Sequence, residues 1–241
     1  MSAEVVLITG AGSPTGRDIA VKLSASYALI LSGRDESLLL KTRSACAESD
    51  KHDMLVLDLA KPDALKENVQ AWLTERSKHV HHFVHMAGVF KVGALRSLSC
   101  EQAQEMFRVN FFAAAEMVKV LSAKKTNSDY LRSVILVSTV SSGWGVRGFQ
   151  YYGASRAAVD AFVRGMALEL APRIRINSLR LGALENERGA PDLLSAAAAT
   201  HPLGLGSGED VASVIEFLIS DGARWITGQN LTVDGGWSCG K

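Results

Sequence analysis

Tyr152 and Arg156 stand four residues apart in the stretch YYGASR, just before an alanine-rich run. Residues at this spacing lie on one face of a helix. Tyrosine can act as a general acid by donating its phenolic proton. Arginine cannot release its own proton in a protein, but its charge favours a nearby tyrosinate. The pair therefore predicts a modified acid–base site or one that has lost its activity, and a surface arginine on a helix is the alternative.

A glycine-rich loop, TGAGSPTGRDIA, follows the first apolar run and spans residues 9–20. Glycine lets the backbone turn sharply and approach a ligand closely, and the start of the next helix attracts an anion. Ser13 and Pro14 suit the N-cap and the first helical position. We expect this loop to hold the phosphates of a dinucleotide, and a structural turn before a helix is the alternative.

Short β-rich runs alternate with helical patterns along the whole chain. The expected strands are 4–9, 28–32, 54–57, 82–86, 133–138, 174–179 and 230–233, and the expected helices are 14–26, 36–48, 62–76, 101–125, 151–171 and 209–219. Several runs are apolar at nearly every position, as strands buried on both faces are. The alternation predicts an α/β fold with one domain over 1–241, built on a doubly wound parallel sheet of seven strands with helices on both faces. Ligands of such sheets bind at the carboxyl ends of the strands.

The second expected strand ends in the sequence ILSGRD. Dinucleotide folds that bind NAD carry an acidic residue here for the ribose 2′-hydroxyl, but Gly33 stands at that position and Arg34 follows it. A guanidinium suits a 2′-phosphate, so we expect NADP(H) in preference to NAD(H). Asp35 could neutralise Arg34, and a solvated arginine at a helix start is the alternative.

Composition narrows the classes of partner. The formal net charge of +1 argues against nucleic acid, and no apolar run approaches the ~20 residues of a membrane span. The N-terminus lacks the basic segment of a secretory signal, and three cysteines without a C-x-x-C motif fit reduced thiols. His79, His81 and His82 lack a metal-ligand spacing, so no metal is expected. We expect a cytoplasmic protein with a small-molecule substrate and no nucleic-acid or membrane partner.

Motifs along essentially the whole chain resemble those of the short-chain dehydrogenase/reductase family. Thr9, Gly10 and Gly16 match its T-G-x-x-x-G-x-G loop, with Pro14 in place of the middle glycine, and residues 201–238 are most like its beta-ketoacyl-carrier-protein reductases. The resemblance implies a Rossmann-fold oxidoreductase. Such an enzyme moves a hydride between a nicotinamide and a carbonyl or alcohol carbon of a small or acyl-type substrate.

The resemblance also implies the catalytic roles. Tyr152 is the general acid of the Y-x-x-x-K motif, and Arg156 replaces the lysine, keeping its charge and ribose contact but not its proton relay. Thr139 stands thirteen residues before Tyr152, where the family has the serine that polarises the carbonyl, and Ser141 is the second choice. Asn110 matches the asparagine that holds a relay water through a local kink in its helix.

Other positions are implied as ligand contacts. The cofactor contacts are Thr9, Gly10, Gly12, Ser13, Thr15, Gly16, Arg34, Asp58, Leu59, Ala87, Gly88, Tyr152, Arg156, Gly182 and Leu184. Asp58 could equally be only the N-cap of the next element. The substrate contacts are Ser141, Trp144 and Tyr151, although aromatic residues here could be plain packing. A lid at about 183–204 would cover the substrate, and Asn186 stands where the family has a carboxamide-binding threonine.

Several functional positions depart from the family pattern. They are Pro14, His85, Met86, Thr139, Arg156 and Leu181. These departures leave open a nucleotide-binding protein with lost or weak catalysis, acting as a scaffold or regulator, or one that binds another nucleotide for non-redox chemistry. The retained Tyr152 and Asn110 favour a working enzyme. Family members commonly assemble through the helices expected at 101–125 and 151–171 and the C-terminal strand, so a homotetramer or homodimer is expected.

Overall fold

One parallel sheet of seven strands organises the protein. The computed structural model describes residues 4–185 and 191–240, and the strands follow the order β3-β2-β1-β4-β5-β6-β7. They are β1 (Val5–Thr9), β2 (Ala28–Gly33), β3 (Asp53–Val56), β4 (His82–His85), β5 (Ser133–Thr139), β6 (Arg175–Leu181) and β7 (Asn230–Val233). Every residue of β5 is buried, because helices cover the sheet on both sides. The predicted doubly wound sheet is therefore confirmed.

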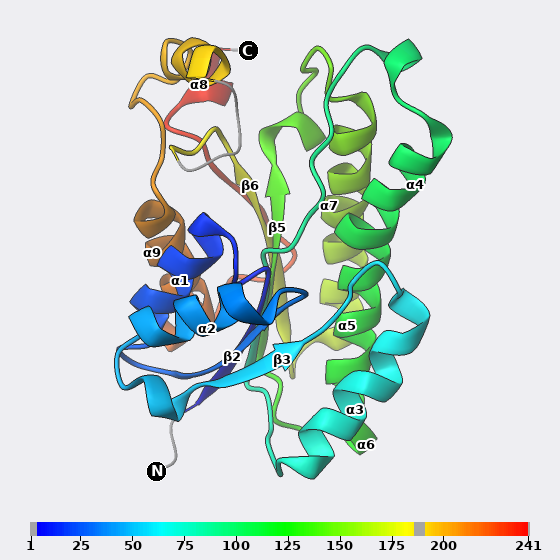
Figure 1. Ribbon diagram of the computed structural model, residues 1–241, viewed down its shortest axis with the longest axis vertical. Coiled ribbons are helices and arrows are strands. Elements are labelled where there is room, and N and C mark those ends of the chain that lie inside the picture. The colour runs from blue at the N-terminus through cyan, green and yellow to red at the C-terminus, as the bar shows by residue number, and fades with distance from the viewer. Residues whose placement is uncertain (1–3, 186–190, 241) are drawn as a thin grey trace.

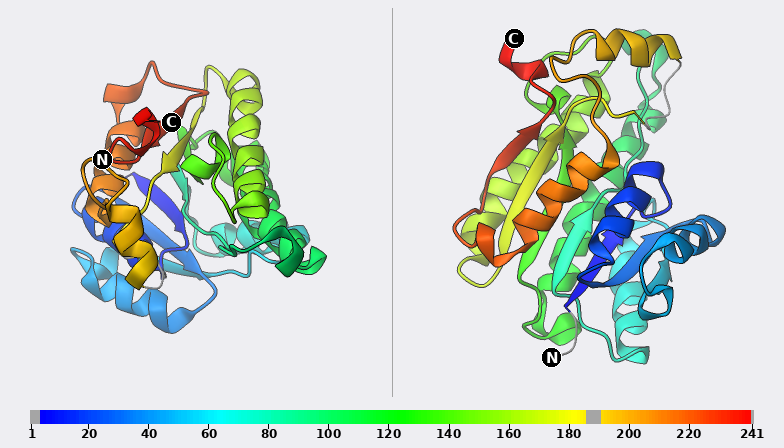
Figure 2. Two further views of the ribbon diagram at one scale, coloured as in Figure 1. Left: turned by 90° about the horizontal axis from the view of Figure 1, so that it is seen from above. Right: turned by 90° about the vertical axis from the view of Figure 1, so that its left-hand side faces the viewer.

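Two layers of helices flank this sheet (Figures 1 and 2). The first layer contains α1 (Pro14–Leu23), α2 (Glu36–Ala45) and α9 (Gly208–Ile219). The second contains α3 (Leu65–Glu75), α4 (Cys100–Phe107), α5 (Ala113–Ser122), α6 (Lys124–Asn127) and α7 (Gln150–Leu170). Helix α8 (Pro191–Ala198) lies at the end of the molecule toward which β5 points (Figure 1).

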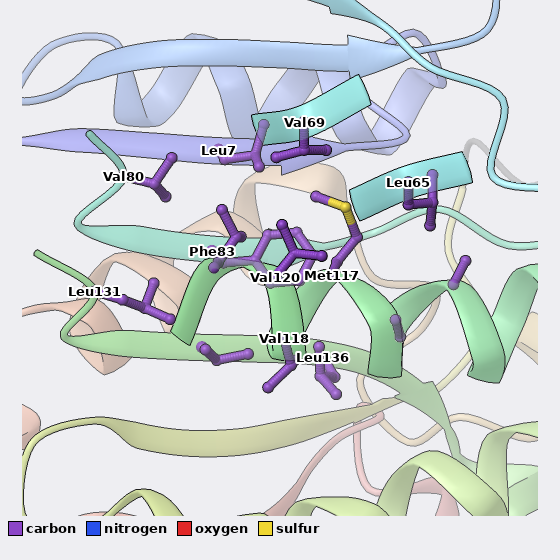
Figure 3. Close-up of a cluster of buried hydrophobic side chains, with 14 of the residues drawn as sticks. Leu7, Leu65, Val69, Val80, Phe83, Met117, Val118, Val120, Leu131 and Leu136 are labelled. Atoms are coloured by element: carbon purple, nitrogen blue, oxygen red, sulfur yellow. The ribbon is translucent and has the colours of Figure 1, made fainter. Parts of the chain in front are cut away.

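Apolar side chains fill both interfaces between sheet and helices. On one side Leu7 and Phe83 of the strands pack with Met117 and Val120 of α5 (Figure 3). On the other side the strands pack against α1, α2 and α9. Burial of this apolar surface is the main force that holds the helices on the sheet, and it gives the strand ends a rigid support.

The helix expected at 101–125 is interrupted in the structure. A π-helical turn, Arg108–Phe112, separates α4 from α5, and α5 ends before α6 begins. The turn contains Asn110, whose side chain is fully buried and bonds to the backbone of Val89 outside the helix. Such turns are rare and occur frequently at functional sites. The π-helical turn lies where the family resemblance implies a local kink at Asn110.

The order of the strands reverses at β1. Because β1 lies between β2 and β4, the connections after β1 and after β4 run in opposite directions along the sheet, and doubly wound sheets bind their ligands in a crevice at such a point. The loop after β1 and the segments after β4 and β5 all reach this end of the sheet. Within the described ranges, no helix has the length and apolar character needed to cross a membrane.

Candidate active site

The glycine loop after β1 is shaped by close backbone contacts. Gly10 has a φ of +74°, and a Cβ there would lie 2.7 Å from the Ala87 nitrogen at the end of β4. A Cβ on Gly16 would collide with the Gly10 carbonyl. Ser13 caps α1 by accepting the Gly16 N–H at 3.1 Å, as predicted. The loop therefore brings the positive end of α1 to the crevice, where an anion is stabilised.

A groove opens beyond the end of β2. It has a volume of about 820 Å³, and its lining consists of Arg34, Asp35, Glu36, Ser37, Leu40 and Met54. The Asp35 carboxylate caps α2, accepting from Leu38 N–H at 3.1 Å and from the Ser37 hydroxyl at 2.7 Å. These hydrogen bonds lower the pKa of Asp35. Arg34 makes no ion pair within the described part of the chain, so its charge stays available in the groove.

The predicted cofactor contacts Asp58 and Leu59 follow β3, the strand whose Met54 lines this groove. Leu59 is buried and packs in the core. Asp58 is exposed and accepts the Ala60 N–H at 3.0 Å, which makes it a turn residue in this structure. Its second oxygen lies 3.9 Å from the Lys61 ammonium. Asp58 therefore has a local structural role whether or not it contacts a ligand.

His85 ends β4 and lies completely inside the protein. Its Nδ1 is 2.9 Å from the Thr9 hydroxyl at the end of β1, so the two strand ends are tied together. Burial lowers the pKa of His85 to about 3, the charge of Arg156 adds to the shift, and the backbone of Val109 opposes it. His85 is therefore neutral at physiological pH. It takes the place of a family asparagine as a structural link.

This buried neutral histidine predicts a pH-dependent stability. The unfolded chain takes up a proton below the ordinary histidine pKa of about 6.5, whereas folded His85 takes it up only near pH 3. The contribution of His85 is complete above pH 6.5 and is lost as the pH falls toward 3. We expect the free energy of unfolding to fall by about 1.4 kcal/mol per pH unit, or about 2 kcal/mol by pH 5.

Urea unfolding at pH 7.5, 6 and 5 measures this loss in the wild type and in His85→Asn. Burial also lowers the pKa of His81 and of His82, so the wild-type curve contains their contributions with the same sign. The difference between the two proteins isolates His85. Parallel pH dependences in the two proteins would contradict the assignment.

Arg156 lies on α7 with its guanidinium buried between two strand ends. Nη1 donates to the Val137 carbonyl of β5 at 2.9 Å, and Nη2 donates to the Ala87 carbonyl after β4 at 3.3 Å. The residue is 3% exposed. A Cβ on Gly88 would collide with Nη2, so the glycine makes room for the arginine. Its Nε is buried and has no hydrogen-bond partner within the described ranges.

Tyr152 begins the same face of α7. Its ring centroid is 5.7 Å from the Arg156 guanidinium carbon. Phe90 and Phe149 pack edge-on around the ring, at centroid distances of 4.9 and 6.1 Å. The structure therefore brings Tyr152 and Arg156 together, with two phenylalanine rings packed around the tyrosine.

Thr139 is the last residue of β5, and Ser141 lies in the turn that follows it. The Thr139 hydroxyl oxygen accepts the Ser141 backbone N–H at 3.4 Å, and the Ser141 hydroxyl lies 3.4 Å away. A Cβ on Gly153 would lie 2.6 Å from the Ser141 carbonyl oxygen. The loop after β5 is thus pressed against the start of α7, one residue from Tyr152.

Asn110 connects the π-helical turn to the same region. Its Oδ1 accepts the Val89 N–H at 2.7 Å, and its Nδ2 lies 3.0 Å from the Val89 carbonyl and 2.9 Å from the Ser155 hydroxyl. Ser155 in turn donates to the Tyr152 carbonyl at 2.8 Å. Asn110 therefore fixes the segment after β4 relative to the helix that carries Tyr152.

The segment after β6 reaches the same end of the sheet. Gly182 has no space for a side chain, because a Cβ would lie 2.8 Å from the Asp234 Cα. Leu184 is buried and pairs with Gly206. Asn186 and the part of the expected lid at 186–190 lie outside the described residues.

The other two predicted substrate contacts lie apart from one another. The Trp144 ring faces the Arg180 guanidinium at 5.8 Å. Tyr151 lines a separate hollow of about 290 Å³, which it shares with Ala103, Gln104, Phe107, Arg108 and Phe112. Tyr151 thus lies toward α4, whereas Tyr152 lies toward Arg156.

Two charged residues at this end of the sheet escaped the sequence reasoning. Asp160 is 2% exposed and continues the four-residue spacing of Tyr152 and Arg156 along α7, so the same spacing could have found it. Arg17 lies in the first turn of α1, and its buried Nε has no hydrogen-bond partner in the described part of the chain. The sequence could have indicated Arg17, because it is a basic residue near the start of the helix that is expected to bind an anion. Groups of three or more metal-ligating side chains are absent from the described ranges.

Comparisons with known proteins agree with this arrangement. The family model described as Enoyl-(Acyl carrier protein) reductase matches residues 10–238. The chain is 30% identical to the 3-oxoacyl-acyl-carrier-protein reductase FabG of Thermotoga maritima, over 98% of both chains. It is also 30% identical to the vibriobactin-specific 2,3-dihydro-2,3-dihydroxybenzoate dehydrogenase of Vibrio cholerae, over 96% of this chain and 94% of that one.

A solved structure described as ElxO with NADP bound has the same fold. The TM-score is 0.88 at 21% identity, covering 98% of this chain and 99% of that one. The family match extends over nearly the whole sequence, and the sheet order and helix layers agree with it. The chain belongs to the short-chain dehydrogenase/reductase family of oxidoreductases.

Proposed function

We propose that this protein is an NADP(H)-dependent oxidoreductase that acts on a carbonyl or alcohol carbon of a small or acyl-type substrate. The observation that carries the proposal is the placement of Tyr152 against the buried guanidinium of Arg156 at the ends of β4 and β5. A phenol held beside a fixed cation is suited to donate its proton. The named relatives include a reductase and a dehydrogenase, which supports this class of reaction.

The residues at the crevice fit a dinucleotide. Gly10 and Gly16 let the loop pack tightly against the backbone at Ala87 and on itself, and the start of α1 offers N–H groups to a diphosphate. The groove at Arg34 is large enough for an adenosine, and its free guanidinium suits a 2′-phosphate. Ala87 and Gly88 follow β4 at the same end of the sheet and pack against the Arg156 guanidinium. The ElxO structure holds NADP in a fold of this kind.

The chain's own residues would perform the acid–base part of the reaction. Bound NADPH supplies the hydride that reduces a carbonyl carbon. Tyr152 donates its phenolic proton to the carbonyl oxygen, and the Arg156 cation stabilises the negative charge that remains on the tyrosine. Thr139 donates a second hydrogen bond to that oxygen. Because the Thr139 oxygen accepts the Ser141 N–H, its own proton stays available, which favours Thr139 over Ser141.

Asn110 and Arg156 would set how the proton is replaced. Arginine does not release its proton, so Arg156 acts through its charge and its hydrogen bonds. Asn110 holds the backbone of Val89 in place beside Gly88. Because Arg156 cannot supply it, the proton that recharges Tyr152 would come from water that enters the site.

A second candidate rests on the hydrogen bonds of Arg156. Both terminal nitrogens are engaged with strand carbonyls, so the side chain holds the strand ends as a structural cation. A nucleotide-binding scaffold with weak or lost catalysis would have this arrangement. It differs from the first proposal in binding NADPH without turning over a substrate.

The two candidates are separated by one experiment. NADPH binding is measured first, and NADPH oxidation is then followed with ketones, quinones and acyl thioesters. Turnover with at least one compound supports the oxidoreductase if Tyr152→Phe largely removes it. Binding without turnover across the whole set supports the scaffold.

The cofactor preference makes a prediction of its own. Arg34→Ala should weaken NADPH binding by roughly ten- to a hundredfold, because it removes one charge-assisted contact with the 2′-phosphate. NADH binding should stay unchanged, since NADH lacks that phosphate. Titration of the intrinsic fluorescence with each cofactor measures both affinities.

Arg43→Ala is the matched control, because Arg43 lies in the last turn of α2, away from the groove lining. This variant should bind both cofactors as the wild type does. Equal losses of NADPH and NADH affinity in Arg34→Ala, or tighter NADH binding in the wild type, would refute the assignment of Arg34.

Self-assembly belongs to the same proposal. Apolar side chains are exposed on the helices expected to meet, with Phe112 of the π-helical turn 52% exposed and Leu168 of α7 86% exposed. Covering such groups stabilises an interface. Their exposure supports a homodimer or homotetramer.

A further inference from the structure

Helix α7 carries a second charged side chain on the face that holds Tyr152 and Arg156. Asp160 follows Arg156 by four residues and is 2% exposed, so its carboxylate lies between the helix and the sheet. A buried charge is costly unless it is paired and hydrogen-bonded. The role of Asp160 is therefore given by its partners.

The partners come from two different segments. From β6, Arg180 donates from Nε at 2.7 Å and Ser178 donates from its hydroxyl at 2.8 Å. From the loop after β5, the Ser142 hydroxyl donates at 2.5 Å. One carboxylate thus connects α7, β6 and the loop that begins at Thr139. We call this loop, residues 139–144, the hydroxyl loop.

Arg180 makes further contacts with β7 and with the hydroxyl loop. In the amide orientation that satisfies both of its groups, Asn230 of β7 donates to Ser178 at 2.9 Å and accepts from Arg180 at 3.3 Å and from Arg164 at 2.7 Å. The Trp144 ring faces the Arg180 guanidinium at 5.8 Å. Arg180 therefore contacts the far end of the hydroxyl loop while it neutralises Asp160.

The hydroxyl loop is consequently held on α7 at two points. At Gly153 its backbone leaves no space for a side chain, and at Asp160 its Ser142 side chain is bonded. Ser142 also lies 2.7 Å from the Thr139 carbonyl oxygen. Thr139 itself ends β5 and pairs with Leu181, and the turn that follows it is bonded to α7 at Asp160, eight residues beyond Tyr152.

We propose that Asp160, Arg180 and Ser142 are positioning residues that hold the hydroxyl loop, and with it the Thr139 hydroxyl, in register with Tyr152. This inference deepens the proposed function and depends on the role given there to Thr139. The three residues touch no reacting atom. They act by fixing the loop, and small misplacements of a catalytic group are enough to cost large factors in rate.

Two serines that bond the same carboxylate provide a matched test. Ser142→Ala removes the link from Asp160 to the hydroxyl loop, whereas Ser178→Ala removes a link from Asp160 to β6 and leaves the loop attached. Ser142→Ala should lower kcat by roughly ten- to a hundredfold with NADPH affinity unchanged. Ser178→Ala should lower Tm by about 2–4 °C and leave kcat near the wild-type value.

Amide hydrogen exchange tests the loop without any turnover. The backbone N–H groups of Gly143 and Trp144 both bond the Val140 carbonyl, at 3.1 and 3.0 Å, and their protection reports opening of the loop. Their exchange should be faster in Ser142→Ala and unchanged in Ser178→Ala. Asp160→Asn should reproduce the faster exchange. This variant changes the bond from Ser142 to the carboxylate but keeps the contact of Ser142 with the Thr139 carbonyl, so it tests the carboxylate bond by itself.

The outcomes distinguish this inference from the proposed function. Unchanged exchange in Ser142→Ala, or equally faster exchange in Ser178→Ala, overturns the inference even if the enzyme is active. Faster exchange in Ser142→Ala alone supports the loop attachment even if the wild type turns over no substrate, in which case only the proposed function has failed. Faster exchange with an unchanged kcat in an active enzyme overturns the positioning role.

Discussion

Tyr152→Phe is expected to lower kcat for carbonyl reduction by roughly a thousandfold, because the variant removes the proton donor and leaves every other contact in place. The phenylalanine ring still packs against Phe90 and Phe149 and still lies beside the Arg156 guanidinium. NADPH affinity and Tm should therefore be unchanged. Steady-state oxidation of NADPH with the best substrate of the compound set measures the loss.

Tyr130→Phe provides the control for this loss. Tyr130 stacks on His79 at a ring-centroid distance of 4.0 Å, near the start of β4, whereas the crevice lies at the carboxyl ends of the strands. Removal of its hydroxyl should leave kcat at the wild-type value. If Tyr152→Phe retained full activity, a different group would have to supply the proton, and the proposed mechanism would be wrong.

Arg156→Met is expected to lower kcat by roughly a hundredfold, because a chain of similar length replaces the only group that brings positive charge to the Tyr152 ring in the described part of the site. The Val137 and Ala87 carbonyls lose their donors at the same time. Unpaired buried groups of this kind should lower the free energy of unfolding by about 1–3 kcal/mol. Kinetics and urea unfolding measure the two effects separately.

Arg156→Lys separates the charge from the shape of the guanidinium. The ammonium keeps a positive charge and three donors but lacks the planar fork that reaches two carbonyls. We expect kcat to stay within about tenfold of the wild-type value, with a smaller loss of stability than in Arg156→Met. Equal activity in Arg156→Met and in the wild type would contradict an electrostatic role.

A comparison of the arginine and lysine proteins also addresses the scaffold candidate. If the wild type binds NADPH without turnover and Arg156→Lys gains turnover, the arginine itself blocks catalysis. The pH dependence of kcat gives a second signature, because lysine can ionise and arginine cannot. A profile that differs between the two proteins would locate the proton supply at this position.

Local patterns in the sequence predicted the main elements of this fold. Apolar runs such as those of β1 and β5 became strands, because a strand buried on both faces must be apolar at nearly every position. Ser13 capped α1 as expected, because a cap depends on residues within one helical turn. The spacing of Tyr152 and Arg156 placed them on one helical face for the same reason. Such features need no knowledge of distant segments.

The partners of the site residues depended on the tertiary structure. Arg156 bonds carbonyls at the ends of β4 and β5, and His85 bonds Thr9 across two strands. Asn110 leaves the helical pattern to bond the backbone at Val89. Nothing in the local sequence selects these partners, because each bond joins segments that become neighbours only when the parallel sheet assembles.

The sequence by itself determined a doubly wound sheet, a glycine loop before α1 and a tyrosine–arginine face, since short-range patterning specifies all three. The tertiary structure alone decided that Asp160, on the same helical face, is neutralised by Arg180 of β6. It also decided that Arg34, next to the Asp35 cap of α2, shares a groove with Met54 of β3. The physical reason is that a buried charge must find partners wherever the packed chain supplies them, and their identity follows from packing between distant segments.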